Sequence, residues 1–371
     1  MFFDANKVFD LEQQRITVCL VSPFPPPMGG MAIQAVKLAA LLEGAGYRVL
    51  TVRTNADFPA PLAFIRNIPG LRTLVNSLLF LVHLHGAARQ TDVVYFLTGF
   101  FNFFFWITYP ALLLCKLAGI PVILSARGGA AAEFFARYKP LVAPVLRRVE
   151  RITTPSGFLQ KAFVDAFAIT PTVVPNIADF DQFHFRLRQT LAPKLIVTRS
   201  LEEIYNVGCV IRAFARVKAR FPEATLAVVG DGGERRRLEE LARELGLASA
   251  ATFHGRVDHA RIQALYDEND ISVNASNVDN LPGTILEAFA CGLPVVSTRA
   301  GGIPYMVEDG VTGLLVDLDD DEALATRVLD LLENPDLAQR LIANARKECE
   351  KYSADRVREI LEPLLTEVVS S

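Results

Sequence analysis

Short apolar runs alternate along this chain with longer stretches whose apolar positions recur at helical spacing. The first run, Arg15 to Val21, predicts a strand, and a Pro- and Gly-containing loop follows over Ser22 to Gly30. Met31 to Gly46 then has the spacing of a helix. Further strands are predicted at 47–52, 92–97, 121–124 and 151–154. Strands that alternate with helices are typical of a parallel sheet with helices on both faces.

The same alternation begins again after about residue 186. Strands are predicted there at 194–198, 224–229, 251–253, 270–274, 293–297 and 313–316. Two such sets predict two doubly wound α/β domains that face each other across a cleft, with ligands at the carboxyl ends of the strands. Val174 to Gln189 interrupts the pattern with Pro175-Asn176 and several polar residues, and is the expected linker. No strand follows the last helical stretch, 353–369.

Size and charge agree with two ordinary domains and indicate the kind of partner. The chain has 371 residues, 51% of them apolar, which is enough for two hydrophobic cores. Residues 1–185 carry 16 Lys/Arg and 11 Asp/Glu, whereas 186–371 carry 22 and 30. The basic first half suggests contact with phosphate groups, a membrane surface or a phosphorylated acceptor. Nucleic acid fits less well, because the excess is modest and no DNA- or RNA-binding motif is present.

The cysteines and the N-terminal residues indicate a cytoplasmic protein. None of the cysteines forms a Cys-x-x-Cys pair, so buried reduced thiols are expected instead of a zinc site or disulfide framework. They are Cys19, Cys115, Cys209, Cys291 and Cys349. Residues 1–15 lack the cationic start and apolar core of a signal peptide.

The segment Val93 to Cys115 has no charged residue and includes FFNFFFW at Phe100 to Trp106. Three alternatives fit it: a membrane span, a buried strand followed by a helix, or a partly exposed aromatic surface that contacts a membrane or a lipid tail. Gly99, Asn102 and Pro110 argue against the span. Arg137 to Arg151 mixes cationic and apolar side chains, which favours the surface, although a solvated helix face would have the same composition.

The stretch Asp279 to Gly302 contains the clearest candidate chemistry. It reads DNLPGTILEAFACGLPVVSTRAGG, with a Leu-Pro-Gly-Thr turn before a helical run. The N–H groups at a helix start can hold phosphate oxygens. The carboxylates of Asp279 and Glu287 can accept hydrogen bonds from sugar hydroxyls. A nucleotide-sugar requires both kinds of contact.

The run from Glu287, Glu-Ala-Phe-Ala-Cys-Gly-Leu-Pro-Val, resembles the donor-site signature of the family 4 (group 1) retaining glycosyltransferases. Asp279 replaces the first Glu of that signature, with the same charge and a shorter reach, and an ordinary βαβ unit is the alternative interpretation. The resemblance implies the GT-B fold of two Rossmann-like domains. Residues 1–185 would bind the acceptor, 186–352 would bind the donor, and a helix at 353–371 would cross back to the first domain.

The resemblance also implies roles for individual residues. The candidate catalytic residues are Arg199, Arg127, Asp279 and Glu287. Arg199 would hold the donor diphosphate and Glu287 the ribose. Further donor contacts are expected from two Gly-containing loops, a turn, a segment beside the base and the start of the helix; these residues are Gly29, Gly30, Asn206, Gly230, His254, Leu281, Pro282, Gly283 and Thr284. The expected acceptor contacts are Phe100, Asn102 and Arg127.

Two positions depart from the family pattern. Asn206 stands where a second cation, Lys, is usual, and an amide brings no charge to a diphosphate. Arg127 stands where His is usual, and could supply the missing charge; a salt bridge to Glu133 is the alternative. The reaction proposed for the family needs no enzymic base, because the departing phosphate helps to deprotonate the acceptor.

The leading hypothesis is therefore a retaining, metal-independent glycosyltransferase without a cofactor. It would move a sugar from a nucleotide-diphosphate-sugar, a UDP- or GDP-sugar, to a hydroxyl of a glycan or lipid-linked acceptor. Cell-surface polysaccharide biosynthesis at the inner face of the membrane would fit, and nucleic acid is not an expected partner. The alternatives are a non-catalytic nucleotide-sugar- or glycan-binding protein, suggested by Asn206, Arg127 and Asp279, and a nucleotide-sugar epimerase of the same fold.

Overall fold

The computed structural model describes residues 15–26, 29–55, 64, 68–178, 180 and 182–370. The N-terminal residues on which the absence of a signal peptide was inferred lie almost wholly outside this part, as do residues 27 and 28 of the first loop. The chain forms two compact units. The first contains the described residues of Met1–Pro155, Ala162–Val174 and Arg358–Ser371; the second contains Ser156–Lys161 and Pro175–Val357. The functional division into domains at 185 and 352 stays a prediction.

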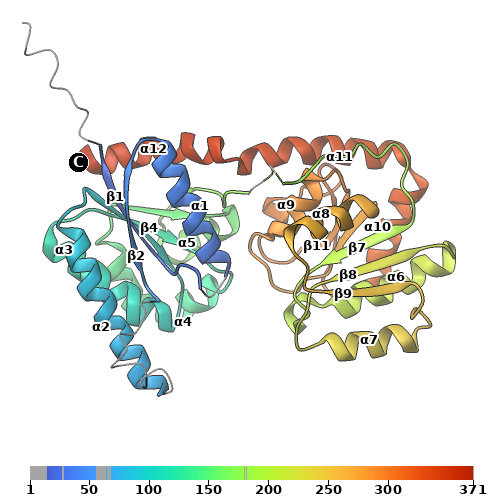
Figure 1. Ribbon diagram of the computed structural model, residues 1–371, viewed down its shortest axis with the longest axis horizontal. Helices are drawn as coiled ribbons and strands as arrows, with labels where there is room; N and C mark the ends of the chain where they lie inside the picture. Colours follow the sequence, from blue (N-terminus) through green and yellow to red (C-terminus); the bar gives the residue numbers. More distant parts are fainter. Residues whose placement is uncertain are drawn as a thin grey trace, which may run out of the picture. The chain divides into compact units, whose positions relative to one another are not determined.

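A six-stranded, fully parallel sheet forms the centre of the first unit (Figure 1). Its order is β2-β1-β3-β4-β5-β6. The strands are β1 (Thr17–Ser22), β2 (Arg48–Arg53), β3 (Val93–Thr98), β4 (Val122–Ala126), β5 (Arg151–Thr154) and β6 (Thr172–Val173). All but the two-residue β6 were predicted from the apolar runs. β1, β3 and β4 are buried on both faces and are therefore mainly apolar, with small hydroxyl residues such as Ser22, Thr98 and Ser125 at a few positions.

Helices connect these strands. They are α1 (Gly30–Gly44), α2 (Pro69–Ala88), the π-helical turn η3 (Phe104–Thr108), α3 (Tyr109–Ala118), α4 (Ala131–Leu146) and α5 (Gly157–Phe167), whose first turn is grouped with the second unit. The last helix, α12 (Ala354–Ser370), belongs to the first unit from Arg358 onward. Within that unit its Glu367 forms an ion pair with Arg151 of β5.

The second unit repeats the design with the order β12-β11-β10-β7-β8-β9, again all parallel. Its strands are β7 (Lys194–Thr198), β8 (Thr225–Val229), β9 (Ala251–Gly255), β10 (Ile271–Asn274), β11 (Val295–Thr298) and β12 (Leu314–Val316). Its α-helices are α6 (Val207–Arg220), α7 (Arg235–Glu244), α8 (His259–Glu268), α9 (Gly283–Ala290), α10 (Asp321–Glu333) and α11 (Pro335–Cys349). Short 3₁₀ turns are η4 (Glu203–Tyr205), η5 (Ile303–Tyr305) and η6 (Glu350–Tyr352).

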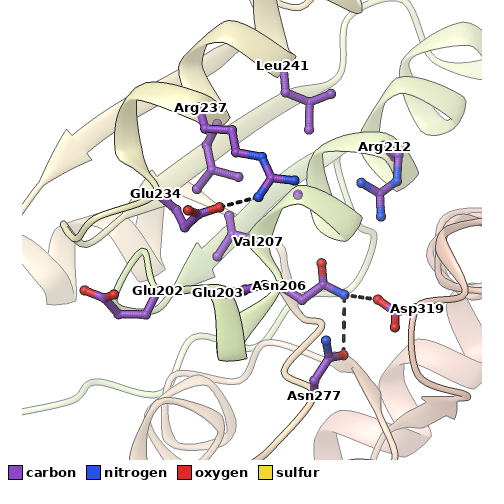
Figure 2. A pocket seen from close by; sticks show the side chains of 12 residues that line it. Glu202, Glu203, Asn206, Val207, Arg212, Glu234, Arg237, Leu241, Asn277 and Asp319 are labelled. Atoms are coloured by element: carbon purple, nitrogen blue, oxygen red, sulfur yellow. Dashed lines mark hydrogen bonds and ion pairs between the residues drawn. The ribbon is translucent and has the colours of Figure 1, made fainter.

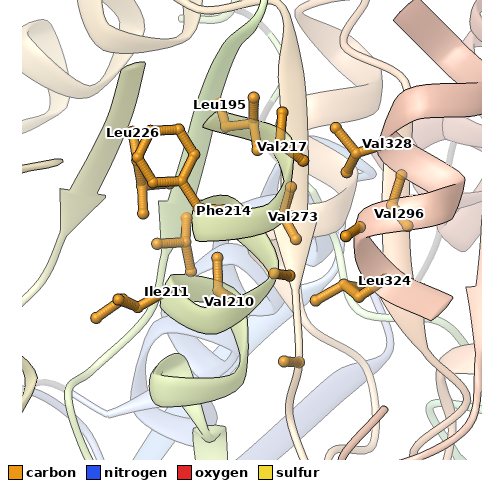
Figure 3. Close-up of a cluster of buried hydrophobic side chains, with 14 of the residues drawn as sticks. Leu195, Val210, Ile211, Phe214, Val217, Leu226, Val273, Val296, Leu324 and Val328 are labelled. Carbon is orange, nitrogen blue, oxygen red and sulfur yellow. The ribbon is translucent and has the colours of Figure 1, made fainter. Parts of the chain in front are cut away.

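Alternate residues of the central strands supply two cores in the second unit. Leu195 and Val197 of β7 pack with Phe214 and other residues of α6 and with α10 on one face (Figure 3). Ile196 points to the opposite face and packs with residues of α8 and α9 such as Tyr266. Burial of both faces stabilises the sheet and fixes the positions at which its strands end.

In each sheet the strand order reverses once, next to the first strand. The reversal lies between β1 and β3 in the first unit and between β7 and β10 in the second. Loops that leave neighbouring strands at such a point diverge to opposite faces of the sheet and leave a crevice at the carboxyl ends. Each unit therefore has one topologically favoured place for a ligand.

The uncharged segment 93–115 forms β3, η3 and the greater part of α3, so it is a strand followed by a helix. The strand is buried, whereas Trp106, Tyr109 and Leu113 of the helical part are exposed. Most of its phenylalanine rings pack with rings of α4; Phe100, Phe101, Phe104 and Phe105 all lie within 6 Å of Phe134, centroid to centroid. Among the residues that the structure describes, no helix combines the length and the apolarity needed to span a membrane.

Candidate functional site

Arg199 lies at the strand-order reversal of the second unit and joins its two sides. It follows β7 directly, and its Nε donates a hydrogen bond to Oδ1 of Asn274, the last residue of β10, over 3.0 Å. Its Nη2 forms an ion pair with Asp279. The two side chains are only 11% and 12% exposed. Two residues that the sequence singled out separately are thus direct partners.

Arg199 stays positively charged although its side chain has little contact with water. Burial lowers the pKa of Arg199 to about 10, and Tyr205, Tyr266 and Glu287 act against that shift. The guanidinium also lies over the Tyr205 ring, 4.8 Å from its centroid. A pKa of about 10 leaves the side chain cationic at neutral pH, so a fixed cation is available to a phosphate at this point.

Two glycines hold the loop that carries Asp279. A Cβ on Gly302 would lie 1.8 Å from the carbonyl oxygen of Asn280, and one on Gly301 would lie 2.1 Å from that of Asp279. The Gly302 N–H donates to the Asp279 carbonyl over 2.9 Å. The Gly-Gly pair therefore allows two backbones to touch, and thereby fixes the position of the Asp279 carboxylate.

Gly230 has a similar structural reason to be glycine. Its φ is +136°, and a Cβ there would lie 1.9 Å from the Arg199 carbonyl oxygen. Its N–H donates to the Gly255 carbonyl over 2.9 Å, next to His254 in β9. Gly230 thus aligns the ends of β7, β8 and β9, and contact with a ligand is not needed to explain it. Burial, and then the charge of Arg261, lower the pKa of His254 below its usual value.

Glu287 is held by a tyrosine that the sequence did not single out. The hydroxyl of the buried Tyr266, on α8, donates to Glu287 Oε2 over 2.9 Å. The same hydroxyl lies 3.1 Å from Oγ1 of Thr198, the residue before Arg199. Burial, and then the charge of Glu287, raise the pKa of the Tyr266 phenol, so it keeps the proton that it donates. Tyr266 therefore connects the end of β7 to the carboxylate on α9.

The expected phosphate contacts form the start of α9. Pro282 is the N-cap residue and is buried, and the helix begins at Gly283 without a side-chain cap. Gly283 is exposed, whereas Leu281 and Thr284 are half-buried. A Cβ on Gly283 would meet no described atom within 4 Å. The N–H groups of Gly283 and Thr284 thus stand at an open helix start, where an anion is favoured.

Asn206 belongs to a separate pocket of about 220 Å³ at the start of α6 (Figure 2). Its Nδ2 donates to Asp319 Oδ1 over 2.5 Å and to Asn277 Oδ1 over 3.4 Å. Its φ of 45° turns the chain, so that the preceding residue, Tyr205, is the one beside Arg199. The lining includes Glu202, Glu203, Glu234, Asp319, Arg212 and Arg237 but none of the other expected site residues.

In the first unit, the expected residues follow β1, β3 and β4. Gly29 is the N-cap residue of α1 and Gly30 its first residue, and a Cβ on either would meet no described atom within 4 Å. The Phe100 ring is half-buried against Phe134 and Phe135, and Asn102 is exposed. The first turn of α1 is therefore open, whereas Phe100 is largely part of the aromatic cluster.

Arg127 follows β4, and its backbone N–H donates to the Thr98 carbonyl over 2.8 Å. Its Nε donates to Ser125 Oγ over 3.1 Å. Burial lowers the pKa of Arg127, and the Tyr95 hydroxyl acts against the shift. The guanidinium is thus held at the carboxyl end of the first sheet.

Sequence reasoning missed Asn274, Tyr266 and Tyr205. Asn274 carried a signal, since it is a polar residue at the end of an otherwise buried strand. Tyr266 and Tyr205 carried none, because a tyrosine in a helical pattern is ordinarily a core residue. Only the packing shows that their polar or π-electron groups meet Glu287 and Arg199.

Comparison with known proteins assigns the chain to a family. The model described as glycosyl transferases group 1 matches residues 180–348, and the model described as glycosyltransferase family 4 matches residues 28–182. Together they account for most of the chain. The chain therefore belongs to the group 1, family 4 glycosyltransferases.

Two relatives illustrate the similarity in sequence. A GDP-mannose-dependent alpha-(1-6)-phosphatidylinositol monomannoside mannosyltransferase of Mycolicibacterium smegmatis is 30% identical over 219 residues, 53% of this chain and 57% of that protein. A D-inositol 3-phosphate glycosyltransferase of Corynebacterium jeikeium is 33% identical over 223 residues, 55% of this chain and 53% of that protein. The chain thus spans about half the length of these curated relatives.

Solved structures establish the GT-B fold. Anabaena Alr3699/HepE, crystallised with UDP and glucose, matches with a TM-score of 0.70 at 18% identity, over 95% of this chain and all of that one. Sucrose-phosphate synthase of Thermosynechococcus elongatus matches with a TM-score of 0.75 at 19% identity, over 96% of this chain and all of that one. At such identities the likeness concerns the fold, two Rossmann-like units with parallel sheets.

Proposed function

We propose that this protein is a retaining glycosyltransferase that takes a sugar from a nucleoside-diphosphate-sugar. The observation that carries the proposal is the convergence of Arg199, Asp279 and the Tyr266-held Glu287 at the strand-order reversal of the second unit. A cation for phosphate, carboxylates for sugar hydroxyls and an open helix start are together what a nucleotide-sugar requires. The names of the relatives, which include a GDP-mannose-dependent enzyme and a UDP complex, support GDP or UDP as the nucleotide.

In the proposed binding mode, Glu287 accepts hydrogen bonds from the ribose. Arg199 and the N–H groups of Gly283 and Thr284 hold the diphosphate, and Asp279 accepts from the transferred sugar. His254 and the end of β9 lie beside the base. Leu281 and Pro282 shape the turn, and Gly230 positions Arg199. Gly29 and Gly30 allow close approach of the ligand at the start of α1.

The proposed reaction breaks the bond between the sugar and the distal phosphate and forms a bond from the same face of the sugar to the acceptor oxygen. The acceptor proton passes to the departing phosphate. Arg199 and the dipole of α9 stabilise the negative charge that develops on the leaving diphosphate. Charge stabilisation thus comes from the protein itself and requires no metal ion or cofactor.

The first unit, within residues 1–185, is proposed to bind the acceptor, a hydroxyl of a glycan or of a lipid-linked precursor of a surface polysaccharide. Arg127, held by Ser125, is proposed to contact a phosphate of that acceptor, with Phe100 and Asn102 nearby at the end of β3. With this role, the protein is proposed to act in the cytoplasm, at the inner face of the membrane. Asn206 is proposed to order the loop after Arg199 through Asp319.

The test is thermal unfolding of the full chain with UDP, GDP and ADP and their sugar conjugates. A nucleotide at about 100 times its Kd should stabilise the wild type by roughly 2.7 kcal/mol, and Arg199→Ala should lose that stabilisation. Arg237→Ala removes an exposed cation of the separate pocket and should keep it. Stabilisation by no nucleotide, or its persistence in Arg199→Ala, would contradict the proposed donor site.

A further inference from the structure

Helix α2 of the first unit exposes a continuous apolar stripe. Leu71, Leu74, Leu78 and Val82 recur three or four residues apart and so lie on one side of the helix. They are between 40% and 69% exposed. The opposite side, which includes Phe80 and Leu84, is buried in the unit. A soluble surface helix normally presents polar residues to water, so this stripe needs an explanation.

The neighbouring helical segment repeats the feature. Trp106 of η3 and Tyr109, Leu113 and Leu117 of α3 have the same spacing and are 41% to 82% exposed. Helix α2 packs against both η3 and α3, and Figure 1 shows α2 and α3 side by side in the first unit. The two stripes therefore lie on adjacent helices. The aromatic run 100–106, in contrast, is mostly packed inside, although Trp106 is exposed on this surface.

An apolar groove continues the surface from α3 to α4. It has a volume of about 360 Å³ and is lined by Phe105, Tyr109, Pro140, Leu141, Pro144 and Arg148. Leu141 is exposed, and Arg148 stands at the rim with its Nη1 donating to the Pro144 carbonyl over 2.8 Å. The groove thus combines apolar walls with one cation.

The charge on these helices is mostly positive. Helices α2 and α3 carry Arg72 and Lys116 and no acid, and α4 carries Arg137 and Lys139 beside one acid, Glu133. Arg72 of α2 and Lys116 of α3 are exposed on the helices that carry the stripes. The surface therefore complements a partner that is both apolar and anionic.

We propose that the surface formed by the exposed stripes of α2 and of η3/α3, with the groove beside Leu141, docks on an anionic phospholipid bilayer. Leucines would enter the acyl boundary, Trp106 and Tyr109 would lie at headgroup depth, and Arg72, Lys116 and Arg148 would meet lipid phosphates. A second copy of this chain fits less well, because an isologous contact would bring two sets of cations together. The proposal rests on the proposed function only in that docking would bring a lipid-linked acceptor to the enzyme.

The experiment is flotation of the full chain with vesicles of phosphatidylcholine alone or with phosphatidylglycerol added. The wild type should float with the vesicles that contain phosphatidylglycerol, and high salt should reduce the bound fraction. Leu78→Gln with Leu117→Gln should lower the partition coefficient about tenfold, and Lys116→Glu also about tenfold. Leu245→Gln, a similarly exposed leucine of the second unit, should leave it unchanged.

Each variant is first checked for the wild-type unfolding temperature and nucleotide stabilisation, so that a misfolded protein is not scored. Equal flotation of the double variant and the wild type would overturn the proposal. A second result would also overturn it: the wild type binds neither kind of vesicle but is a dimer, and Leu78→Gln/Leu117→Gln dissociates the dimer. The partner that covers this surface would then be a second copy of the chain. Flotation without nucleotide binding would leave the docking surface standing and contradict the proposed function instead.

Discussion

Arg199 and Asp279 form a nearly buried ion pair at the place proposed for the donor diphosphate. The Asp279 carboxylate is therefore paired with the guanidinium that the phosphates would need. Because a guanidinium has donors in several directions, Asp279 need not leave completely, but it competes for Arg199 and repels the incoming anion. The pair holds Arg199 in place, and at the proposed site it would oppose nucleotide binding.

Asp279→Asn should bind the nucleoside diphosphate more tightly while transferring sugar more slowly. Removal of the carboxylate charge relieves competition and repulsion, and a gain of ~1.4 kcal/mol would lower Kd about tenfold. Loss of the acceptor for a sugar hydroxyl should lower the transfer rate. Isothermal titration and a nucleotide-release assay measure the two effects.

The matched control is Asp330→Asn, which changes an acid that pairs with Arg327 on the surface of α10 instead of with Arg199. Its Kd for the nucleotide should stay within about twofold of the wild type, as expected for an exposed contact. A weaker nucleotide affinity in Asp279→Asn would show that the carboxylate supports phosphate binding instead of competing with it.

Tyr266→Phe should weaken binding through the ribose. The variant removes the hydroxyl that donates to Glu287, and it leaves Thr198 without that partner. Affinity for a ribonucleotide should fall about tenfold, whereas affinity for the 2′,3′-dideoxy analogue should stay the same. Tyr352→Phe, at another buried tyrosine, is the control. Equal losses for the two ligands would assign Tyr266 a purely structural role.

Gly302→Ala should displace the loop that carries Asp279. The added Cβ would lie 1.8 Å from the Asn280 carbonyl oxygen, so the backbone must move. We expect the nucleotide stabilisation to disappear while far-ultraviolet circular dichroism stays unchanged. Gly208→Ala in α6 places its Cβ no closer than 3.5 Å to a neighbour and should keep the stabilisation. Full nucleotide stabilisation in Gly302→Ala would show that the loop position is not critical.

Arg188→Met should strongly destabilise the second unit. The Arg188 side chain is fully buried, forms an ion pair with Asp270, and donates to the carbonyls of Tyr266 and Cys291. Its removal takes one of two cations from the nearly buried Asp270 and a donor from the buried Tyr266 carbonyl, at a cost of about 3 kcal/mol in the free energy of unfolding. Urea denaturation should show this loss. Arg186→Met removes a half-exposed partner of the same Asp270 and should cost less than about 1 kcal/mol. Equal losses of unfolding free energy in the two variants would contradict the special role given to the buried Arg188.

The alternation of strands and helices was readable from the sequence because it is local. Strands buried on both faces are mostly apolar, so β7 and β8 appear as runs of Leu, Ile, Val and Ala between helical periods. The two-residue β6 is too short to leave such a run. The turn Leu281 to Thr284 likewise predicted a helix start, and α9 begins at Gly283.

The direction in which individual side chains point could not be predicted from the sequence. Tyr205 and Asn206 are adjacent, yet the first faces Arg199 and the second faces Asp319. The positive φ of Asn206 produces this divergence. Nothing in the sequence pointed to Tyr266 either, because its ring has an ordinary core position and only its hydroxyl reaches the site.

The sequence by itself determined the two sets of parallel strands, the helix start after Pro282 and the pair of carboxylates, since each depends on neighbours in the chain. Only the tertiary structure decided that Arg199 meets Asn274 and Asp279. Those contacts exist because β10 lies beside β7 instead of continuing outward from β9. That order is set by how the helices pack on both faces of the sheet, and residue spacing along the chain does not encode it.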